Sequence, residues 1–334
     1  MQSTNRVRVV LHIGGAKCGS SAIQAYLAQN AQLLTARGLG VPGISLDFSS
    51  SVTGEQIWFF EDAVATNALS EVSDRISDLL ETAIHRKLES IVISAENICN
   101  HPQLADVFAS RLSDVDVSVL FYVRRQDDFL ISSWQQWNLK RFPSVEAFLA
   151  ERAGKDARWM TMIRPWAEAF GDERITVRPF VRDQLLNEDV IDDFFHVLGI
   201  SQDGLRPLER NANPSFDEAL ARLAHRARDV FDGPHDNRFY DVMSRLLGRS
   251  ALKRGSASSL LSLDTRRQIL KLYDQENREL KARFIPGTVE GPLFRMPSAK
   301  DVIERGEAER LSEDIAMLTR AIYALAARSE GGTA

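Results

Sequence analysis

The chain has 334 residues, of which 44% are hydrophobic and 26% are charged, the composition of an ordinary soluble globular protein. Its formal net charge of −5 and its pI of about 5.8 argue against bulk nucleic-acid binding, which requires a basic face. Its two cysteines, Cys18 and Cys99, are too few for a disulfide framework and form no Cys-x-x-Cys pair, so structural zinc is not expected either.

The N-terminal residues 1–8 are polar and lead directly into an apolar run, without the long apolar stretch and cleavage site of a signal peptide. No segment approaches the roughly 20 apolar residues that a membrane span needs. Together with the small number of cysteines, these patterns predict a cytoplasmic protein without a membrane span.

Short apolar runs rich in β-branched residues alternate with helical patterns through the first 200 residues. Predicted strands cover residues 7–13, 90–94, 116–123 and 175–180. Predicted helices cover residues 20–36, 72–88, a segment containing Trp166 and Phe170, and 190–198, and a loop rich in Gly, Pro and Ser covers 38–54. This alternation predicts an α/β fold with a P-loop-like parallel sheet flanked by helices.

From residue 214 onward the pattern is helical almost throughout, and residues 260–284 form the longest predicted stretch. No internal repeat, low-complexity tract or clear linker divides the chain. We therefore expect a single domain over residues 1–334, with a core over about 7–200 and a C-terminal helical extension over about 210–328.

Residues 14–21 (GGAKCGSS) join the first predicted strand to the first predicted helix. In parallel α/β sheets, ligands bind beyond the carboxyl ends of the strands. Glycines let the backbone approach a ligand closely, and the N–H groups at a helix start attract an anion. Lys17 adds a positive charge, and Ser20 and Ser21 add hydroxyl donors. The loop therefore predicts a phosphate site.

The order of these residues, G-x-x-K-x-G-[ST]-[ST], differs from the nucleoside-triphosphate loop G-x-x-x-x-G-K-[ST]. No apolar strand ends in an aspartate that would hold Mg²⁺. A P-loop nucleotide kinase is kept as the alternative enzyme. A glycine-rich turn with a solvated lysine is the alternative without any ligand.

A second polar segment, residues 122–132 (YVRRQDDFLIS), follows the third predicted strand. Arg124 lies at the strand end, where its guanidinium could bind two phosphate oxygens. Ser132 lies eight positions further, about 12 Å along a helix, so the two can meet on one ligand only if the turn folds back. An ordinary helix start capped by Asp127 or Asp128 would give the same spacing.

Together the two segments resemble the signature of the sulfotransferases that use 3′-phosphoadenylyl sulfate (PAPS), particularly the bacterial members. In that family K-[TSC]-G-[TS]-[TS] holds the 5′-phosphosulfate and R-x-P-x-D-x-x-x-S holds the 3′-phosphate. This chain carries the first as Lys17-Cys18-Gly19-Ser20-Ser21 and the second as Arg124, Asp128 and Ser132, with Gln126 in place of the usual proline. The similarity covers roughly residues 7–284.

The resemblance implies in-line transfer of a sulfuryl group from PAPS to an acceptor hydroxyl or amine, with no required metal and no covalent enzyme intermediate. Lys17 would stabilise charge on the departing phosphate, and residues 18–21 would hold that phosphate. Arg124 and Ser132 would hold the 3′-phosphate, and Ser132 would also restrain Lys17 until the acceptor arrives. The acceptor is open; a carbohydrate, a glycolipid, a small metabolite and a protein residue all fit.

The family uses either a histidine or a glutamate as the base that takes the acceptor proton. Glu96 follows the second predicted strand and is the first choice, because it would lie at the same sheet edge as the phosphate loop. His12, inside the first predicted strand, is the alternative base. Each residue also has an ordinary structural explanation, Glu96 as a helix cap and His12 as a packed core residue.

Weaker candidates complete the site. Trp134 and Trp137 could line an acceptor or adenine pocket, or pack in the core. Asn213 and Ser215 resemble an Asn-x-Ser element of relatives, and Lys253-Arg254-Gly255 resembles a basic loop near the 3′-phosphate. A nucleotide-binding protein without turnover is the remaining alternative function.

Overall fold

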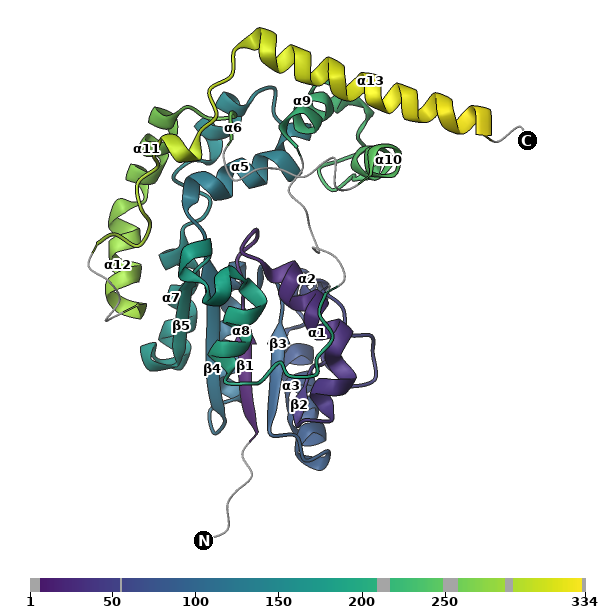
Figure 1. Cartoon of the computed structure of the whole chain (residues 1–334). Helices are drawn as coiled ribbons and strands as arrows, with labels where there is room; N and C mark the ends of the chain where they lie inside the picture. The colour runs from purple at the N-terminus through teal and green to yellow at the C-terminus, as the bar shows by residue number, and fades with distance from the viewer. Residues whose placement is uncertain (1–6, 55, 209–216, 249–257, 286–290, 332–334) are drawn as a thin grey trace. The chain divides into compact units, whose positions relative to one another are not determined.

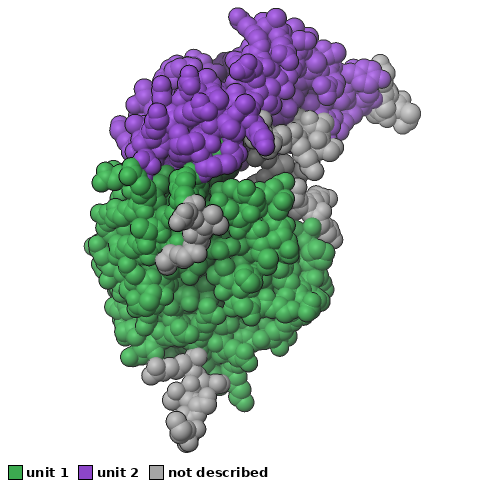
Figure 2. Space-filling model, turned by 60° about the vertical axis from the view of Figure 1, so that its left-hand side comes forward, with its two compact units in different colours: residues 1–125, 158–212, 275–294 green, residues 126–157, 213–274, 295–334 purple. Residues whose placement is uncertain are grey.

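The computed structural model describes residues 7–54, 56–208, 217–248, 258–285 and 291–331 (Figure 1). The chain forms two compact units (Figure 2): unit 1 takes in residues 1–125, 158–212 and 275–294, and unit 2 takes in residues 126–157, 213–274 and 295–334. Neither unit is one continuous segment of the chain. The single domain with a core over 7–200 and an extension over 210–328 stays a prediction.

Unit 1 contains a parallel sheet of five strands in the order β2-β3-β1-β4-β5. The strands are β1 (Arg8–His12), β2 (Leu39–Gly40), β3 (Ser90–Ser94), β4 (Asp116–Val123) and β5 (Ile175–Pro179). In the central strand, Arg8 pairs with Ser90 of β3 and with Asp116 of β4. The strands are apolar and buried because helices cover both faces, which confirms the predicted fold class.

Two rows of helices cover this sheet. The helices of unit 1 are α1 (Ser20–Thr35), α2 (Gln56–Ala65), α3 (Leu69–His85), α4 (Pro102–Arg111), α7 (Trp159–Phe170), α8 (Val190–Leu198) and α12 (Asp274–Phe284). Helix α1 contacts α8, whereas α3 contacts α4 and α4 contacts α7. These rows lie on opposite faces of the sheet, with α1 and α8 in front in Figure 1, as right-handed crossovers between parallel strands require.

Unit 2 is helical in its described part. Its helices are α5 (Gln126–Gln136), α6 (Val145–Arg152), α9 (Glu218–Arg226), α10 (Arg238–Leu247), α11 (Leu263–Leu272) and α13 (Glu307–Gly331). Helix α11 packs against α5, and α13 packs against α9 and α10. In the described parts of both units, no helix is at once sufficiently long and sufficiently apolar to span a membrane.

Two details of the sequence prediction were wrong. Residues 260–284 do not form one longest helix, because the chain breaks at Tyr273 between α11 and α12, and α13 is longer with 25 residues. The Tyr273 hydroxyl accepts from Gly154 N at 2.8 Å and donates to Asp156 O at 2.7 Å, which holds the break in place. The loop predicted over 38–54 also contains β2, whose two residues pair with β3.

Candidate functional site

Three loops meet at the carboxyl edge of the sheet in unit 1. They follow β1, β3 and β4, which are neighbours in the strand order, so their residues converge on one edge. Asn97, after β3, donates its backbone N–H to Gly14 O at 2.7 Å. Arg124, after β4, donates from Nη1 to Lys17 O at 3.0 Å. The loop after β1 is therefore tied to both of its neighbours.

The predicted phosphate loop ends at the start of α1. Lys17 and Gly19 both have positive φ angles, of 63° and 87°. Gly19 is the N-cap residue, and its carbonyl accepts from Ala22 N at 3.0 Å and from Ile23 N at 3.2 Å. No side chain of the described residues caps this helix start. The backbone N–H groups and the helix dipole therefore favour an anion here.

Aromatic side chains support this loop from within unit 1. A Cβ atom added at Gly15 would lie 2.9 Å from the Trp159 ring. A Cβ atom added at Gly19 would lie 2.8 Å from the Phe180 ring and 3.0 Å from Val190. Both glycines therefore allow a close approach that any larger residue would prevent.

Arg124 is held in place on several sides. Besides its bond to the Lys17 carbonyl, its own carbonyl accepts from Trp159 Nε1 at 2.7 Å. Its guanidinium carbon lies 5.9 Å from the centre of the Phe180 ring. The side chain is half-buried. A guanidinium fixed in this way loses little rotamer freedom when it binds an anion.

Lys17, Glu96 and Arg124 influence one another electrostatically. Burial and the positive charge of Arg124 lower the pKa of Lys17 to about 8, while Glu96 acts in the opposite direction. Burial raises the pKa of Glu96, against the effect of Lys17. The structure thus brings these three predicted residues together, two cationic groups beside one carboxylate.

His12 lies inside the core beneath the loop. Its side chain is 1% exposed, and its Nδ1 lies 2.8 Å from Ser94 Oγ. Its Nε2 has no hydrogen-bond partner among the described residues. The rings of Tyr122 and Phe194 pack against it edge-on. Burial lowers the pKa of His12 to about 3, so the imidazole is neutral near pH 7.

The polar side chains in the rest of the loop turn partly inward. Cys18 is fully buried, its thiol donates to Ala16 O at 3.4 Å, and burial raises its pKa to about 12. Ser20 is 1% exposed and its hydroxyl donates to Gly15 O at 3.4 Å. Ser21 is half-buried. The Cys18 thiol is therefore engaged within the loop and closed off from solvent.

Ser132 lies in unit 2, on α5, and is buried. One helical turn earlier, Asp128 accepts from Arg266 Nη1 at 3.0 Å. Gln126, which replaces the family's proline, is the first residue of α5, a position where proline and other residues are both tolerated. That Ser132 joins Arg124 on one ligand stays a prediction.

The weaker candidates have mixed outcomes. Trp134 packs in the core of unit 2, with its ring 5.6 Å from that of Phe148 and 5.2 Å from that of His225. This confirms a packing role for one tryptophan. Trp137 is half-buried, with its ring 6.4 Å from that of His235. Asn213, Ser215 and Lys253-Arg254-Gly255 lie outside the described residues.

The sequence interpretation missed three residues that shape these segments. Trp159 and Phe180 support the loop and Arg124, and Arg266 binds the first turn of α5. Each of them lies at least 35 residues from the motif that it supports. Phe180 ended a predicted strand and was a weak signal, whereas nothing in the local pattern marked Trp159 or Arg266.

Comparisons with known proteins add little. A scan against protein-family models finds no match. A search of curated proteins also finds no match. Among solved structures, the chain is similar to a sulfotransferase from Alicyclobacillus acidocaldarius, with 19% sequence identity and a TM-score of 0.37, covering 66% of this chain and 92% of that chain. A score this low carries no functional argument, so the proposed function rests on the chain's own residues.

Proposed function

We propose that the chain is a PAPS-dependent sulfotransferase, which transfers a sulfuryl group to a hydroxyl or amine of an acceptor. The observation that carries this proposal is the bond from Arg124 Nη1 to Lys17 O. It joins the two segments that resemble the two halves of the family signature. A nucleotide with phosphates on both sides of its ribose requires two such cationic positions.

The available groups suit the two ends of that nucleotide. The start of α1 offers backbone N–H groups, and Lys17 offers an ammonium, for the 5′-phosphosulfate. Arg124 offers a fixed guanidinium for the 3′-phosphate, with Ser132 as its proposed hydroxyl partner. The acceptor that we favour is a carbohydrate, a glycolipid or a small metabolite, and we place the reaction in the cytoplasm.

In the proposed reaction, the bond between sulfur and the 5′-phosphate oxygen breaks as a bond forms from sulfur to the acceptor atom. The products are 3′,5′-ADP and the sulfated acceptor. Lys17 stabilises the charge that develops on the leaving phosphate, and Ser132 restrains Lys17 beforehand. Glu96 takes the proton from the acceptor, for which a raised pKa is suitable. An imidazole with a pKa of about 3, such as that of His12, is a weak base.

Nucleotide binding is the first test. Isothermal titration calorimetry with 3′,5′-ADP, 5′-AMP and ATP·Mg²⁺ should show the tightest binding for 3′,5′-ADP. Binding of ATP·Mg²⁺ alone would instead favour the kinase alternative. Tight binding of 3′,5′-ADP without sulfation of any acceptor in a broad screen with radiolabelled PAPS would favour a nucleotide-binding protein without turnover.

The base is tested separately. Glu96→Gln should lower kcat by about 10²–10⁴-fold while leaving 3′,5′-ADP binding intact, because a general base acts on the acceptor. Glu89→Gln is a matched control, since Glu89 is exposed and immediately precedes the same strand β3 at its opposite end. Unchanged sulfation by Glu96→Gln would remove Glu96 from the mechanism.

A further inference from the structure

Helix α13 carries an apolar stripe that faces solvent. Its members are Leu311, Ile315, Leu318, Ile322 and Leu325, whose side chains are 37–66% exposed. They are separated by four, three, four and three positions along the chain. This alternation keeps the residues on one side of a helix and is typical of a seam that packs against another helix.

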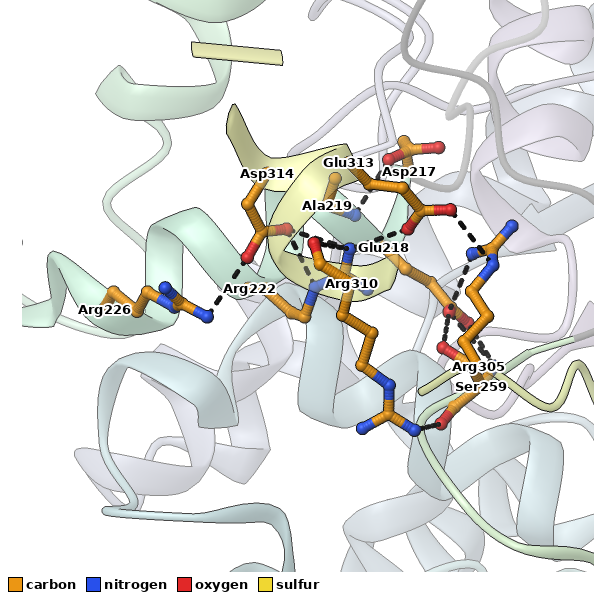
Figure 3. A network of polar contacts seen from close by, with 10 residues as sticks. All are labelled: Asp217, Glu218, Ala219, Arg222, Arg226, Ser259, Arg305, Arg310, Glu313 and Asp314. Atoms are coloured by element: carbon orange, nitrogen blue, oxygen red, sulfur yellow. Dashed lines mark hydrogen bonds and ion pairs between the residues drawn. The ribbon is translucent and has the colours of Figure 1, made fainter. Parts of the chain in front are cut away.

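A neighbouring face of α13 already holds the helix to its own unit. Met317 and Ala321 are buried on that face, which packs against α9 and α10. Figure 3 shows its polar contacts: Arg222 binds Glu313 and Asp314 at 2.9 and 2.8 Å. The exposed stripe is therefore not required to attach the helix and is available to a partner.

The charges of α13 favour a second copy of the same helix, running in the opposite direction. Arginines of unit 2 bind Glu313 and Asp314, which leaves Glu307 and Glu309 as the exposed acids near the start. Arg328 is exposed near the end. An antiparallel pair brings the acidic start of each helix towards Arg328 of the other, whereas a parallel pair places like charges together.

A lipid surface fits these charges less well. Helices that lie in a membrane interface carry many lysines and arginines on their polar face, next to the apolar one. The first half of α13 carries the exposed carboxylates Glu307 and Glu309 instead.

We propose that α13 is a self-association surface, at which two copies of the chain pair their helices antiparallel about a two-fold axis near Arg320. In this register Ile315 meets Leu325 of the second copy, and Leu318 meets Ile322 of the second copy. A two-fold axis then repeats both contacts, so a short stripe forms a closed interface. None of the residues of the candidate functional site takes part.

Sedimentation equilibrium of the full chain over a range of concentrations tests the pairing. The mass should rise with concentration towards twice the monomer mass of 37.5 kDa. Ile322→Glu should weaken self-association at least about tenfold, because it places a charge at the centre of an apolar seam. Ala327→Glu is the matched control, since it adds the same charge at an exposed position away from the stripe. Circular dichroism should show unchanged helix content in both variants.

Cysteine cross-linking tests the orientation. In the antiparallel pair Thr319 lies next to its counterpart across the axis, whereas Ser312 is roughly 24 Å from its counterpart at the rise of an α-helix. Thr319→Cys should therefore form a linked dimer on mild oxidation, and Ser312→Cys should not. Equal linking of both variants would overturn the antiparallel arrangement.

Three results would overturn the proposal as a whole. The first is a monomer mass at every concentration, which would leave the stripe to a different protein. The second is a dimer that Ile322→Glu does not weaken. The third is co-sedimentation of the monomer with phosphatidylcholine–phosphatidylserine vesicles that Ile322→Glu abolishes, which would identify a lipid surface as the occupant.

Discussion

Arg124 Nη1 lies 3.0 Å from the carbonyl oxygen of Lys17, although the two residues are 107 positions apart in the sequence. The bond ties the end of β4 to the loop after β1. Because the acceptor is a backbone carbonyl, the bond does not depend on the side chain of Lys17. Substitutions of Arg124 and Lys17 should therefore have separable effects. A substitution of Arg124 should mainly change the loop geometry and binding of the 3′-phosphate, whereas a substitution of Lys17 should mainly change transfer of the sulfuryl group.

Arg124→Lys should weaken binding of 3′,5′-ADP by about tenfold or more. Lysine keeps the positive charge but loses the fork that can bind a phosphate and the Lys17 carbonyl at the same time, and one charged hydrogen bond contributes about 1.5–3 kcal/mol. Binding of 5′-AMP, which lacks the 3′-phosphate, should weaken less. Calorimetry measures both affinities, with exposed Arg182→Lys as the control. Equal losses for the two nucleotides would place Arg124 away from the 3′-phosphate.

The pH dependence of kcat/KM should reflect the protonation state of Lys17. Burial and Arg124 lower its pKa to about 8, and only the protonated ammonium stabilises a phosphate. Because kcat/KM reflects the free enzyme, it should fall as the pH rises through about 8. Lys17→Arg should move this fall well beyond pH 10, since arginine stays protonated there. A wild-type profile that is flat up to about pH 10 would contradict the role of Lys17.

The sequence was sufficient for features that depend on neighbouring residues or on strand order. The strands at 90–94 and 116–123 were predicted to the residue, because both are apolar runs buried on both faces. A shared edge for Lys17, Glu96 and Arg124 followed from their positions after parallel strands. The support of the loop by Trp159 and Phe180 was not predictable, because packing partners distant in the sequence leave no periodic signal.

The break at Tyr273 shows the same limit. The helical pattern runs on through this residue, but α11 ends there, and the Tyr273 hydroxyl accepts from Gly154 N and donates to Asp156 O. Local propensity carries no information about such distant partners.

Gly19→Ala should destabilise unit 1 and weaken nucleotide binding together. Gly19 has a φ of 87°, and an added Cβ would lie 2.8 Å from Phe180. The backbone strain costs about 1–2 kcal/mol, and the crowding about 1–3 kcal/mol more. Relief of that crowding would shift the start of α1, whose N–H groups are proposed to hold the 5′-phosphate. Thermal unfolding and 3′,5′-ADP titration measure the two effects.

Gly199→Ala separates strain from crowding. Gly199, the C-cap residue of α8, also has a positive φ, of 72°, but a Cβ there would meet nothing within 4 Å. The Gly199→Ala variant should therefore lose only about 1–2 kcal/mol in its free energy of unfolding, and its nucleotide affinity should be unchanged. If both variants lose the same stability and the same nucleotide affinity, crowding of a Cβ against Phe180 has no role in shaping the loop.

Arg266→Met should lower the free energy of unfolding by about 3–5 kcal/mol, because it removes one partner of a buried ion pair. Arg266 and Asp127 are both fully buried, and Nη1 of the arginine lies 2.8 Å from Asp127 Oδ2 and 3.0 Å from Asp128 Oδ1. The pair connects α11 to the first turn of α5, the helix that carries Ser132. Urea titration measures the loss. The exposed neighbour Arg267→Met should change stability by only about 0.5 kcal/mol.

The double variant Asp127→Asn/Arg266→Met shows whether the buried charge is the cause. Removing both charges should recover part of the stability that Arg266→Met loses, since the cost of one uncompensated carboxylate disappears. Additive losses in the double variant would mean that Arg266 acts through packing alone. If the double variant refolds but binds 3′,5′-ADP more weakly than the wild type, the ion pair also sets the position of α5 for its proposed part in the 3′-phosphate site.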